Sequence, residues 1–285
     1  MTIIQWYPGH MAKAKRQMQE DMRIVDMSLV VLDARIPASS YNPDFERILA
    51  KKPVIMVLNK RDLADEKQTT QWLAEFRRRG LGAVALNAQQ AKGRQELMQQ
   101  IMLTAEPLFQ ELEAKGRRRR PVRVMVAGSP NTGKSTLINT LIGKSASKTG
   151  NKPGVTRGKQ WVRVGDWVEL LDTPGVLWPK FEQHSVAFRL AATGAISPTV
   201  YDNYQVSLEL IDWLVNNACP QLCERYKLDA AALEGLSPEE VLHMIGRSRG
   251  LLAAGGMVRE DETARLLLAE FRNGKIGRFT LDMPL

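Results

Sequence analysis

Residues 128–135, GSPNTGKS, constrain the fold more than any other stretch of this chain. They match the spacing G-x-x-x-x-G-K-[ST], follow the apolar run VRVMVA and precede the helix-forming run TLINTLIG. Glycines at these positions let backbone N–H groups wrap a chain of phosphates, and the following helix presents the positive end of its dipole to them. We therefore expect a strand, a phosphate-binding loop and a helix in succession, the central unit of an α/β nucleotide-binding domain.

The rest of the first 180 residues alternates strand-like and helix-like segments. Four short apolar runs predict strands at 28–33, 53–59, 82–87 and 122–128. Amphipathic spacing predicts helices at 65–79 and 91–113, and the alternating run 161–172, interrupted by Gly-Asp, predicts a hairpin of two more strands. The pattern predicts a doubly wound, mainly parallel, six-stranded P-loop domain of the α/β class.

Helical patterns replace strand patterns beyond residue 180. Ser237 precedes the run PEEVLHMIG and is expected to cap a helix there, whereas Gly274 is expected to end the helix that follows EDETARLLL. We therefore expect two domains, residues 1–180 and 181–285. The first includes a basic helix at 8–25, and the second is small and all-helical.

Two motifs carry the expected phosphate and Mg²⁺ chemistry. Lys134 is expected to reach the β- and γ-phosphates, and the Ser135 hydroxyl to bind Mg²⁺. In DTPG, which follows the last predicted strand, Asp172 is expected to hold Mg²⁺ through water and Gly175 to contact the γ-phosphate. Thr156 is the expected second hydroxyl ligand, unless its loop is a plain surface loop. The expected phosphate-side residues are Gly128, Pro130, Asn131, Thr132, Gly133, Lys134, Ser135, Thr136, Asp172 and Gly175.

The stretch NKRD, residues 59–62, follows the predicted buried strand PVIMVL and indicates a guanine reader. The Asp62 carboxylate only accepts hydrogen bonds at neutral pH, so it suits the N1–H and N2–H₂ donors that guanine has and adenine lacks. Asn59 is expected on the O6 side of the base and the Lys60 stem across the ring. A backbone amide of the turn after the next strand, formed by Asn87, Ala88 and Gln89, is expected to contact O6.

The base reader precedes the phosphate loop in this chain, the reverse of the usual order. The order NKRD, LNA, GSPNTGKS, Thr156 and DTPG, led by WYPGHMAKAKRQM and DARIP, resembles the circularly permuted GTPases, in particular those that act in ribosome assembly. The resemblance spans the whole chain. It implies a cytoplasmic GTPase that binds the large ribosomal subunit or its precursor, is stimulated by it, and contacts ribosomal RNA through a helical C-terminal domain.

Val176 stands directly after DTPG, where many GTPases carry a glutamine that orients the attacking water. A permuted chain opens next to this segment, so the N-terminal helix is expected nearby, and His10 is expected to position the water, as the resemblance also implies. A capping or packing role is the alternative for His10. Asn131 resembles the asparagine of potassium-dependent GTPases and is expected to help hold K⁺, unless it only makes a hydrogen bond within its loop.

The net charge of +9 is concentrated in the first part of the chain. Residues 1–180 hold 30 of the 40 lysines and arginines but 17 of the 31 acidic residues, so residues 181–285 are net acidic. Acid-free basic clusters at 114–123 and 144–163 favour a polyanionic partner such as RNA. A solvated linker is the alternative for the four-arginine run. The expected RNA-contacting residues are Lys13, Lys15, Arg16, Arg117, Arg118, Arg119, Arg120, Arg247, Arg249, Arg272, Lys275 and Arg278.

The sequence predicts a cytoplasmic monomer, because it has no leader pattern and no run of eighteen apolar residues. Cys219 and Cys223 are interpreted as buried or idle thiols, since no further metal ligands accompany them. The expected function is a GTP-hydrolysing assembly factor that uses Mg²⁺ and K⁺. One alternative is a nucleotide-gated RNA-binding module in which hydrolysis is incidental. Another is a GTPase acting on membranes or transfer RNA, which the lack of an anchor and of a modification domain disfavours.

Overall fold

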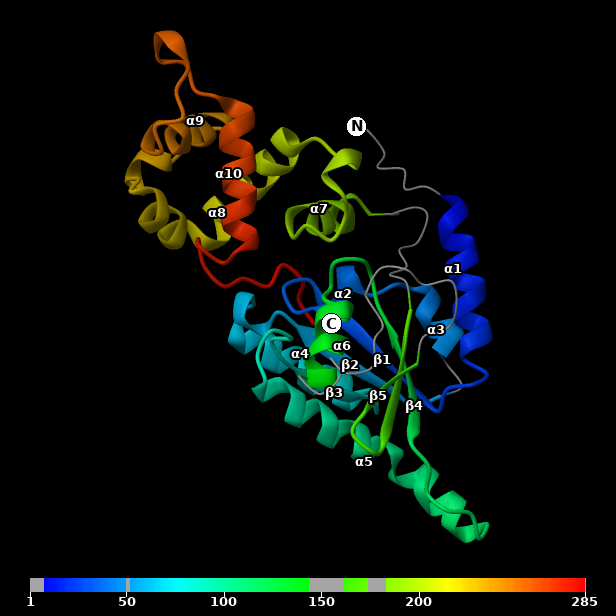
Figure 1. Cartoon of the computed structure of the whole chain (residues 1–285). Helices are drawn as coiled ribbons and strands as arrows, with labels where there is room; N and C mark the ends of the chain where they lie inside the picture. The colour runs from blue at the N-terminus through cyan, green and yellow to red at the C-terminus, as the bar shows by residue number, and fades with distance from the viewer. Residues whose placement is uncertain (1–7, 50–51, 144–160, 174–182, 285) are drawn as a thin grey trace. The chain divides into compact units, whose positions relative to one another are not determined.

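The computed structural model of the chain describes residues 8–49, 52–143, 161–173 and 183–284. The chain divides into two compact units (Figure 1). The larger unit comprises Tyr7–Pro179 together with Thr280–Leu285, and the smaller one contains Lys180–Phe279. The return of the last residues to the larger unit was not predicted from the sequence, which placed them in the helical domain.

A six-stranded sheet forms the centre of the larger unit. Its strand order is β3-β2-β1-β4-β6-β5, and every pair is parallel except β5 with β6, which is an antiparallel hairpin. The strands are β1 (Met27–Asp33), β2 (Val54–Asn59), β3 (Gly82–Ala85), β4 (Val122–Ala127), β5 (Trp161–Val164) and β6 (Val168–Asp172). The predicted mainly parallel α/β fold is therefore confirmed.

Helices cover both faces of the sheet, which explains why its central strands are mostly apolar. All seven residues of β1 are buried, and successive side chains point to opposite faces. Leu29 and Val31 belong to a hydrophobic cluster that includes residues of α5 and α6, whereas Val30 and Leu32 belong to a cluster that includes residues of α1, α3 and α4. The helices of this unit are α1 (Pro8–Asp21), α2 (Pro37–Ser40), α3 (Asp44–Leu49), α4 (Glu66–Arg78), α5 (Lys92–Ala114) and α6 (Lys134–Ile142).

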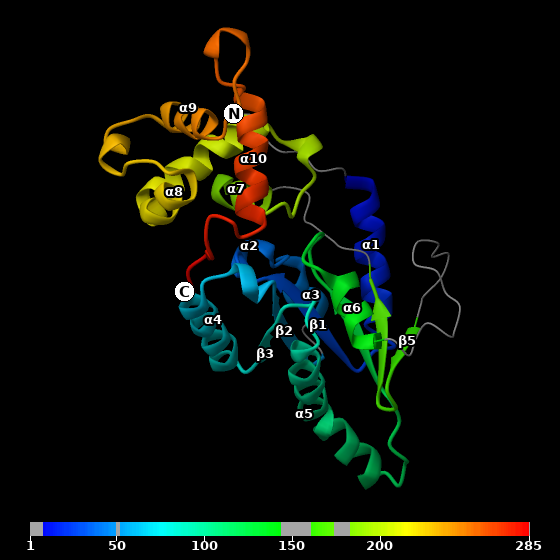
Figure 2. The same ribbon diagram turned by 60° about the vertical axis from the view of Figure 1, so that its left-hand side comes forward.

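Helix α5 continues beyond the sheet. Figures 1 and 2 both show its C-terminal end projecting from the body of the larger unit before the chain turns back into β4. Pro107 lies inside this helix, and Leu103 on it is 70% exposed. The projecting end leads into the four-arginine run, all four residues of which are exposed.

The smaller unit is helical, with a core formed between its long helices. Its helices are α7 (His184–Ala192), α8 (Asn203–Tyr226), α9 (Pro238–Ser248) and α10 (Glu260–Arg272). The predicted cap is confirmed: Ser237 and Glu240 form a capping box at the start of α9. Helix α10 ends just before Gly274, which has a φ of 68° as helix-ending glycines often do.

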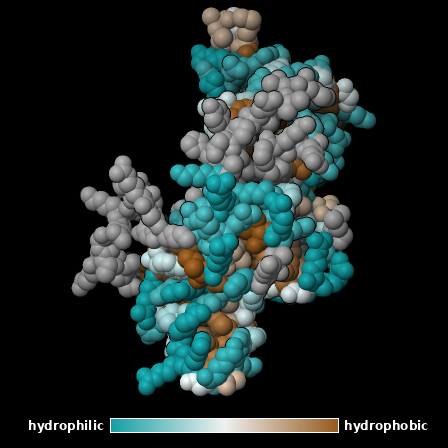
Figure 3. Space-filling view, turned by 90° about the vertical axis from the view of Figure 1, so that its right-hand side faces the viewer, coloured by the Kyte–Doolittle hydropathy of each residue, from teal (hydrophilic) through white to brown (hydrophobic). Residues whose placement is uncertain are grey.

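Hydrophilic side chains dominate the described surface in the space-filling view, and hydrophobic ones form small separate patches (Figure 3). None of the helices in the described ranges is long and apolar enough to cross a membrane.

Candidate functional site

The candidate site lies at the carboxyl ends of β1, β2 and β4. Strands β2 and β3 lie on one side of β1, whereas β4, β6 and β5 lie on the other, so the strand order changes direction between β1 and β4. Ligands of open α/β sheets bind outside the carboxyl ends of the strands at such a point. The glycine-rich loop follows β4 and NKRD follows β2, so the fold brings both predicted motifs to this edge.

The glycine-rich loop has a backbone that requires glycine at two positions. A Cβ on Gly128 would lie 2.4 Å from the Val31 carbonyl oxygen, and a Cβ on Gly133 would lie 2.2 Å from Nδ2 of Asn59. Gly133 also has a φ of 95°, which only glycine adopts readily. Helix α6 begins immediately afterwards at Lys134, so its first N–H groups face the loop.

Lys134 is the main positive charge inside this loop. Its side chain is buried, and its Nζ donates a hydrogen bond of 2.7 Å to the Ser129 carbonyl oxygen. Burial lowers the pKa of Lys134 to about 8, although the nearby Asp172 carboxylate acts in the opposite direction. Burial raises the pKa of Asp172, and the Lys134 charge partly offsets this. The two groups therefore form an electrostatic pair between the start of α6 and the end of β6.

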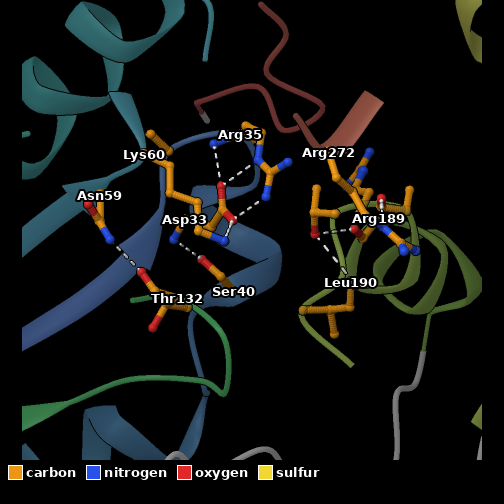
Figure 4. A network of polar contacts seen from close by, with 12 residues as sticks. Asp33, Arg35, Ser40, Asn59, Lys60, Thr132, Arg189, Leu190 and Arg272 are labelled. Carbon is orange, nitrogen blue, oxygen red and sulfur yellow. Dashed lines mark hydrogen bonds and ion pairs between the residues drawn. The ribbon is translucent and has the colours of Figure 1, made fainter. Parts of the chain in front are cut away.

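The structure places Asn59 between two loops of the candidate site. Its Nδ2 donates to the Thr132 carbonyl oxygen at 2.8 Å, as Figure 4 shows, and its Oδ1 accepts from the Ala88 N–H at 2.8 Å. Both ends of this buried amide are thus engaged with backbone. Asn59 therefore joins the glycine-rich loop to the turn after β3. The amide keeps a second N–H and a second lone pair, and its place on the O6 side of the base stays a prediction.

Two backbone N–H groups of the turn at residues 87–89 already donate hydrogen bonds to other groups of the protein. The Ala88 N–H is donated to Asn59, and the Gln89 N–H is donated to Oδ1 of Asn87 at 2.8 Å. An O6 contact from either amide, as expected from the sequence, would require one of these hydrogen bonds to be exchanged. The turn is also tied to α6, because the Thr140 hydroxyl donates to the Ala88 carbonyl oxygen at 2.5 Å.

A buried ion cluster that the sequence analysis did not predict lies beneath NKRD. Asp33, at the end of β1, accepts two side-chain hydrogen bonds from Arg35 at 2.9 and 2.7 Å, and one from the Lys60 Nζ at 2.9 Å (Figure 4). Burial by itself raises the pKa of Asp33, but Arg35 and Lys60 outweigh it and hold this pKa well below its ordinary value. The sequence feature that could have indicated this cluster is DARIP, which places a carboxylate (Asp33) and a guanidinium (Arg35) at the end of the buried strand β1, beside β2.

Lys60 has a left-handed backbone, with φ of 60°, and it starts the short helix η1 (Arg61–Leu63). Its ammonium group is held by Asp33, and its side chain is only 25% exposed. Asp62, within η1, is exposed and lies close enough for its charge to raise the pKa of Arg35. Asp62 therefore lies at the surface, whereas the Lys60 ammonium group is held by the buried Asp33 carboxylate.

Some of the other residues predicted to bind nucleotide or Mg²⁺ lie at the site, and others lie outside the described residues. Ser135 and Thr136 are exposed in the first turn of α6, and Pro130 and Asn131 lie in the loop before it. Thr156 and Gly175 lie outside the described residues. His10 lies in α1, but its side chain is outside the described part of the chain.

Several of the predicted RNA-contacting residues are held by other groups of the protein. Arg119 pairs with Glu113 at 2.6 Å, and Arg120 forms two hydrogen bonds of 2.7 and 2.8 Å with Asp26. Arg272 donates to the carbonyl oxygens of Ala191 and Ala192 at the end of α7. Lys15 pairs with Asp44 at 2.6 Å, and Arg249 donates to the Arg225 carbonyl oxygen at 2.8 Å. Exposed side chains are also found at Lys13, Arg16, Arg117, Arg118, Arg247, Lys275 and Arg278.

Comparison with known proteins places this site in a family. The family described as "50S ribosome-binding GTPase" matches residues 123–225. A ribosome biogenesis GTPase A from Priestia megaterium is 46% identical over 100% of this chain and 98% of its own length. One from Bacillus cereus is 43% identical over 99% of this chain and 94% of its own length.

Two solved structures from Thermotoga maritima match nearly the whole chain. The GNP-bound form of YlqF has a TM-score of 0.66 and 28% identity, covering 95% of this chain and 98% of that one. The GDP-bound form has a TM-score of 0.67 and 28% identity, covering 94% and 99%. The sequence matches and the structural matches both extend over nearly the whole chain. The chain therefore belongs to the ribosome biogenesis GTPase A family of circularly permuted GTPases.

Proposed function

We propose that this GTPase binds the precursor of the large ribosomal subunit in its GTP-bound state and leaves it after hydrolysis that the particle stimulates. The observation that carries the proposal is the Asn59 bridge, which joins the NKRD loop after β2 to the glycine-rich loop after β4. This contact makes one site from two motifs that lie about 70 residues apart in the chain. The names of the relatives supply the ribosomal context.

On this proposal, guanine is read by Asp62 at the surface of η1, with the Lys60 stem against the ring. The Asp33 contact suits this role, because it directs the Lys60 ammonium group away from solvent and holds its methylene stem in place. The N–H groups of the glycine-rich loop and the start of α6 surround the phosphates. Phosphate oxygens beside Lys134 favour its protonated form, which counteracts the effect of burial on its pKa.

The residues present fit a Mg²⁺ ion. The Ser135 hydroxyl is exposed in the first turn of α6, and the Asp172 carboxylate is at the carboxyl end of β6, close to Lys134. Hydroxyl, carboxylate and phosphate oxygens are the ligands that Mg²⁺ prefers. We propose that Ser135 and Thr156 hold it directly and Asp172 through water, and that the bound ion supplies positive charge beside the β- and γ-phosphates.

For the hydrolytic step, the proposal assigns the attacking water to His10, because the aliphatic side chain of Val176 cannot orient it. A histidine can both position water and accept a proton near neutral pH. Replacing His10 by alanine is expected to lower particle-stimulated turnover on the order of a hundredfold, with nucleotide affinity unchanged. Unchanged turnover in that variant would remove His10 from the mechanism.

We further propose that Asn131 helps to hold a K⁺ ion that supplies positive charge during hydrolysis. Asn131 is exposed in the glycine-rich loop and has a left-handed backbone with φ of 56°. Turnover measured in KCl should exceed turnover in NaCl at equal ionic strength. Equal rates in the two salts would refute the K⁺ assignment.

For the RNA contact, the proposal rests on the exposed basic residues rather than on the whole predicted set. Arg117 and Arg118 follow the projecting end of α5, and Arg247 is exposed in the last turn of α9. Replacing a phosphate-contacting lysine or arginine should weaken binding and reduce its salt dependence. Arg119 and Arg120 should contribute less, because acidic side chains of the protein already pair with them.

Sedimentation with ribosomal particles tests the proposal as a whole. The protein should co-sediment with large-subunit precursors in the presence of a non-hydrolysable GTP analogue and dissociate in GDP. Lys134→Ala, which removes the buried charge from the glycine-rich loop, is the matched variant that should lose the nucleotide dependence. Binding that is the same in both nucleotides for the unaltered protein would contradict the proposal.

A nucleotide-gated RNA-binding module is the second candidate, and Val176 in place of a water-orienting glutamine is the observation that favours it. In that case hydrolysis would be incidental. The rate of GTP hydrolysis would then be equal with and without ribosomal particles, although RNA binding would still depend on the nucleotide. Both candidates describe a monomer that works in the cytoplasm.

A further inference from the structure

The C-terminal segment Thr280–Asp282, called the C-terminal strap below, lies between two loops of the candidate site. The Thr280 hydroxyl donates to the Ala34 carbonyl oxygen at 3.3 Å and accepts from the Asp65 N–H at 3.2 Å. Ala34 directly follows the last residue of β1, and Asp65 is three residues beyond Asp62 of NKRD. One buried hydroxyl therefore joins the loop after β1 to the loop after β2.

The rest of the C-terminal strap adds four hydrogen bonds to the same region. The Leu281 N–H donates to the Arg35 carbonyl oxygen at 2.7 Å. The Asp282 carboxylate accepts from both the N–H and the hydroxyl of Ser39, at 2.6 and 2.8 Å, and its carbonyl oxygen accepts from Trp72 Nε1 at 3.1 Å. Thr280, Leu281 and Asp282 are each 6% exposed or less, so the strap is a buried part of the larger unit.

The strap binds the segment after β1, and this segment also contacts NKRD and the glycine-rich loop. Arg35 and Lys60 share the Asp33 carboxylate. Ser40, at the end of α2, accepts at its hydroxyl from the Asp33 N–H at 3.1 Å, and its carbonyl oxygen accepts from the Ser129 hydroxyl at 2.6 Å. Contacts therefore run without interruption from the strap to Lys60 on one branch and to the glycine-rich loop on the other.

We propose that the C-terminal strap is a positioning element for the guanine-reading loop, acting through the Asp33–Lys60 contact. This inference rests on the proposed reading of guanine by Lys60 and Asp62. Asp33 is the positioning residue nearest the base, because it holds the Lys60 ammonium group, and Arg35 connects it to the strap through its backbone carbonyl oxygen. Losing the strap frees the loops after β1 and β2 to move apart, and Lys60 with them.

The strap is also the point at which the chain leaves the helical unit. Phe279, the residue before it, packs against Trp213 and Phe271, with ring centroids 5.6 and 6.0 Å away. A single peptide bond thus connects a residue anchored in the helical unit to one anchored beside the guanine-reading loop. The strap therefore directly follows, in the chain, the unit that is proposed to contact RNA.

Nucleotide binding by full-length variants tests this inference. Asp282→Ala and the nearly isosteric Thr280→Val remove strap contacts, and Met283→Ala is the matched control, because Met283 follows the strap and is 68% exposed. The dissociation constant for fluorescently labelled GDP is measured where circular dichroism shows each protein to be folded. We expect GDP affinity to fall on the order of tenfold in both strap variants and to stay unchanged in Met283→Ala.

A double-mutant cycle with Lys60→Ala separates positioning from general stability. If the strap acts through Lys60, Asp282→Ala should have little further effect on GDP affinity once Lys60 is replaced. Effects that multiply independently, or an unchanged GDP affinity in a folded Thr280→Val protein, would overturn the inference. A wild-type protein that does not prefer GDP to ADP would instead overturn the proposed function, and the inference with it. A wild-type preference for GDP that strap variants leave intact overturns the inference alone.

Discussion

Replacing Asn59 by alanine tests whether this residue holds the site together or reads the base. The change removes the two hydrogen bonds that its amide makes to the backbone of Thr132 and Ala88. Asn59, Thr132 and Ala88 are all 3% exposed or less, so both backbone groups lose a partner in the interior. A buried polar group left unpaired costs about 1–3 kcal/mol, which gives about 2–6 kcal/mol for the two groups. Because water can enter a polar cavity, we expect the lower half of this range.

Urea unfolding followed by circular dichroism measures this loss directly. For a domain of this size, a loss of about 3 kcal/mol also lowers the melting temperature by about 6–12 °C. Asn139→Ala is the matched control, since Asn139 is an exposed asparagine on α6. GDP affinity should fall with stability in Asn59→Ala, because the glycine-rich loop loses its connection to the NKRD loop. If GDP affinity falls but the unfolding free energy is reduced by less than about 1 kcal/mol, this reasoning is refuted. Direct contact with the base would then be the main role of Asn59.

Three further changes test neighbouring parts of the site. Gly133→Ala should abolish detectable GDP binding and lower the free energy of unfolding by about 1–3 kcal/mol, because the new Cβ would meet Nδ2 of Asn59 at 2.2 Å. Nucleotide titration and urea unfolding measure these two effects, and tight GDP binding by the variant would contradict the prediction. GDP affinity should fall as pH rises above about 8, where Lys134 loses its proton; Lys134→Ala should lack this pH dependence in calorimetric titrations. The pKa of Asp33 is lowered in the folded state, so its stabilising contribution is complete above the ordinary value of 3.8 and is lost as pH falls below it. The difference in unfolding free energy between wild type and Asp33→Asn should therefore shrink on acidification, and a constant difference would be evidence against the ion cluster.

The strands of the sheet could be predicted from the sequence because each is marked by the residues of its own segment. Each strand buried on both faces is a short run of apolar residues, and each predicted run matches the strand found there to within two residues at either end. The glycine-rich loop was equally clear, since its glycines, lysine and flanking strand and helix are consecutive in the chain. The order of NKRD and this loop then sufficed to identify a permuted GTPase, which the comparisons confirm.

The roles of individual polar residues were less predictable. The sequence predicts Asn59 beside guanine O6, but it did not predict the two hydrogen bonds of its amide to backbone groups that adjoin it only in the folded chain. Arg119 and Arg120 appeared equivalent to Arg117 and Arg118 within one basic run, yet Glu113 and Asp26 pair with the first two. A side chain's partners depend on which loops meet in space, and composition and spacing do not encode that directly.

Sequence alone determined the fold class, the phosphate loop and the family, because these depend on periodicity and on short contiguous motifs. Tertiary structure decided which carboxylate holds Lys60 and where the end of the chain binds. Ser39 and Asp282 form their hydrogen bonds across 243 residues, and no local pattern marks either residue as a partner of the other. The burial of apolar strands is a property of each segment taken singly, whereas hydrogen bonds between loops exist only after the sheet has brought their ends together.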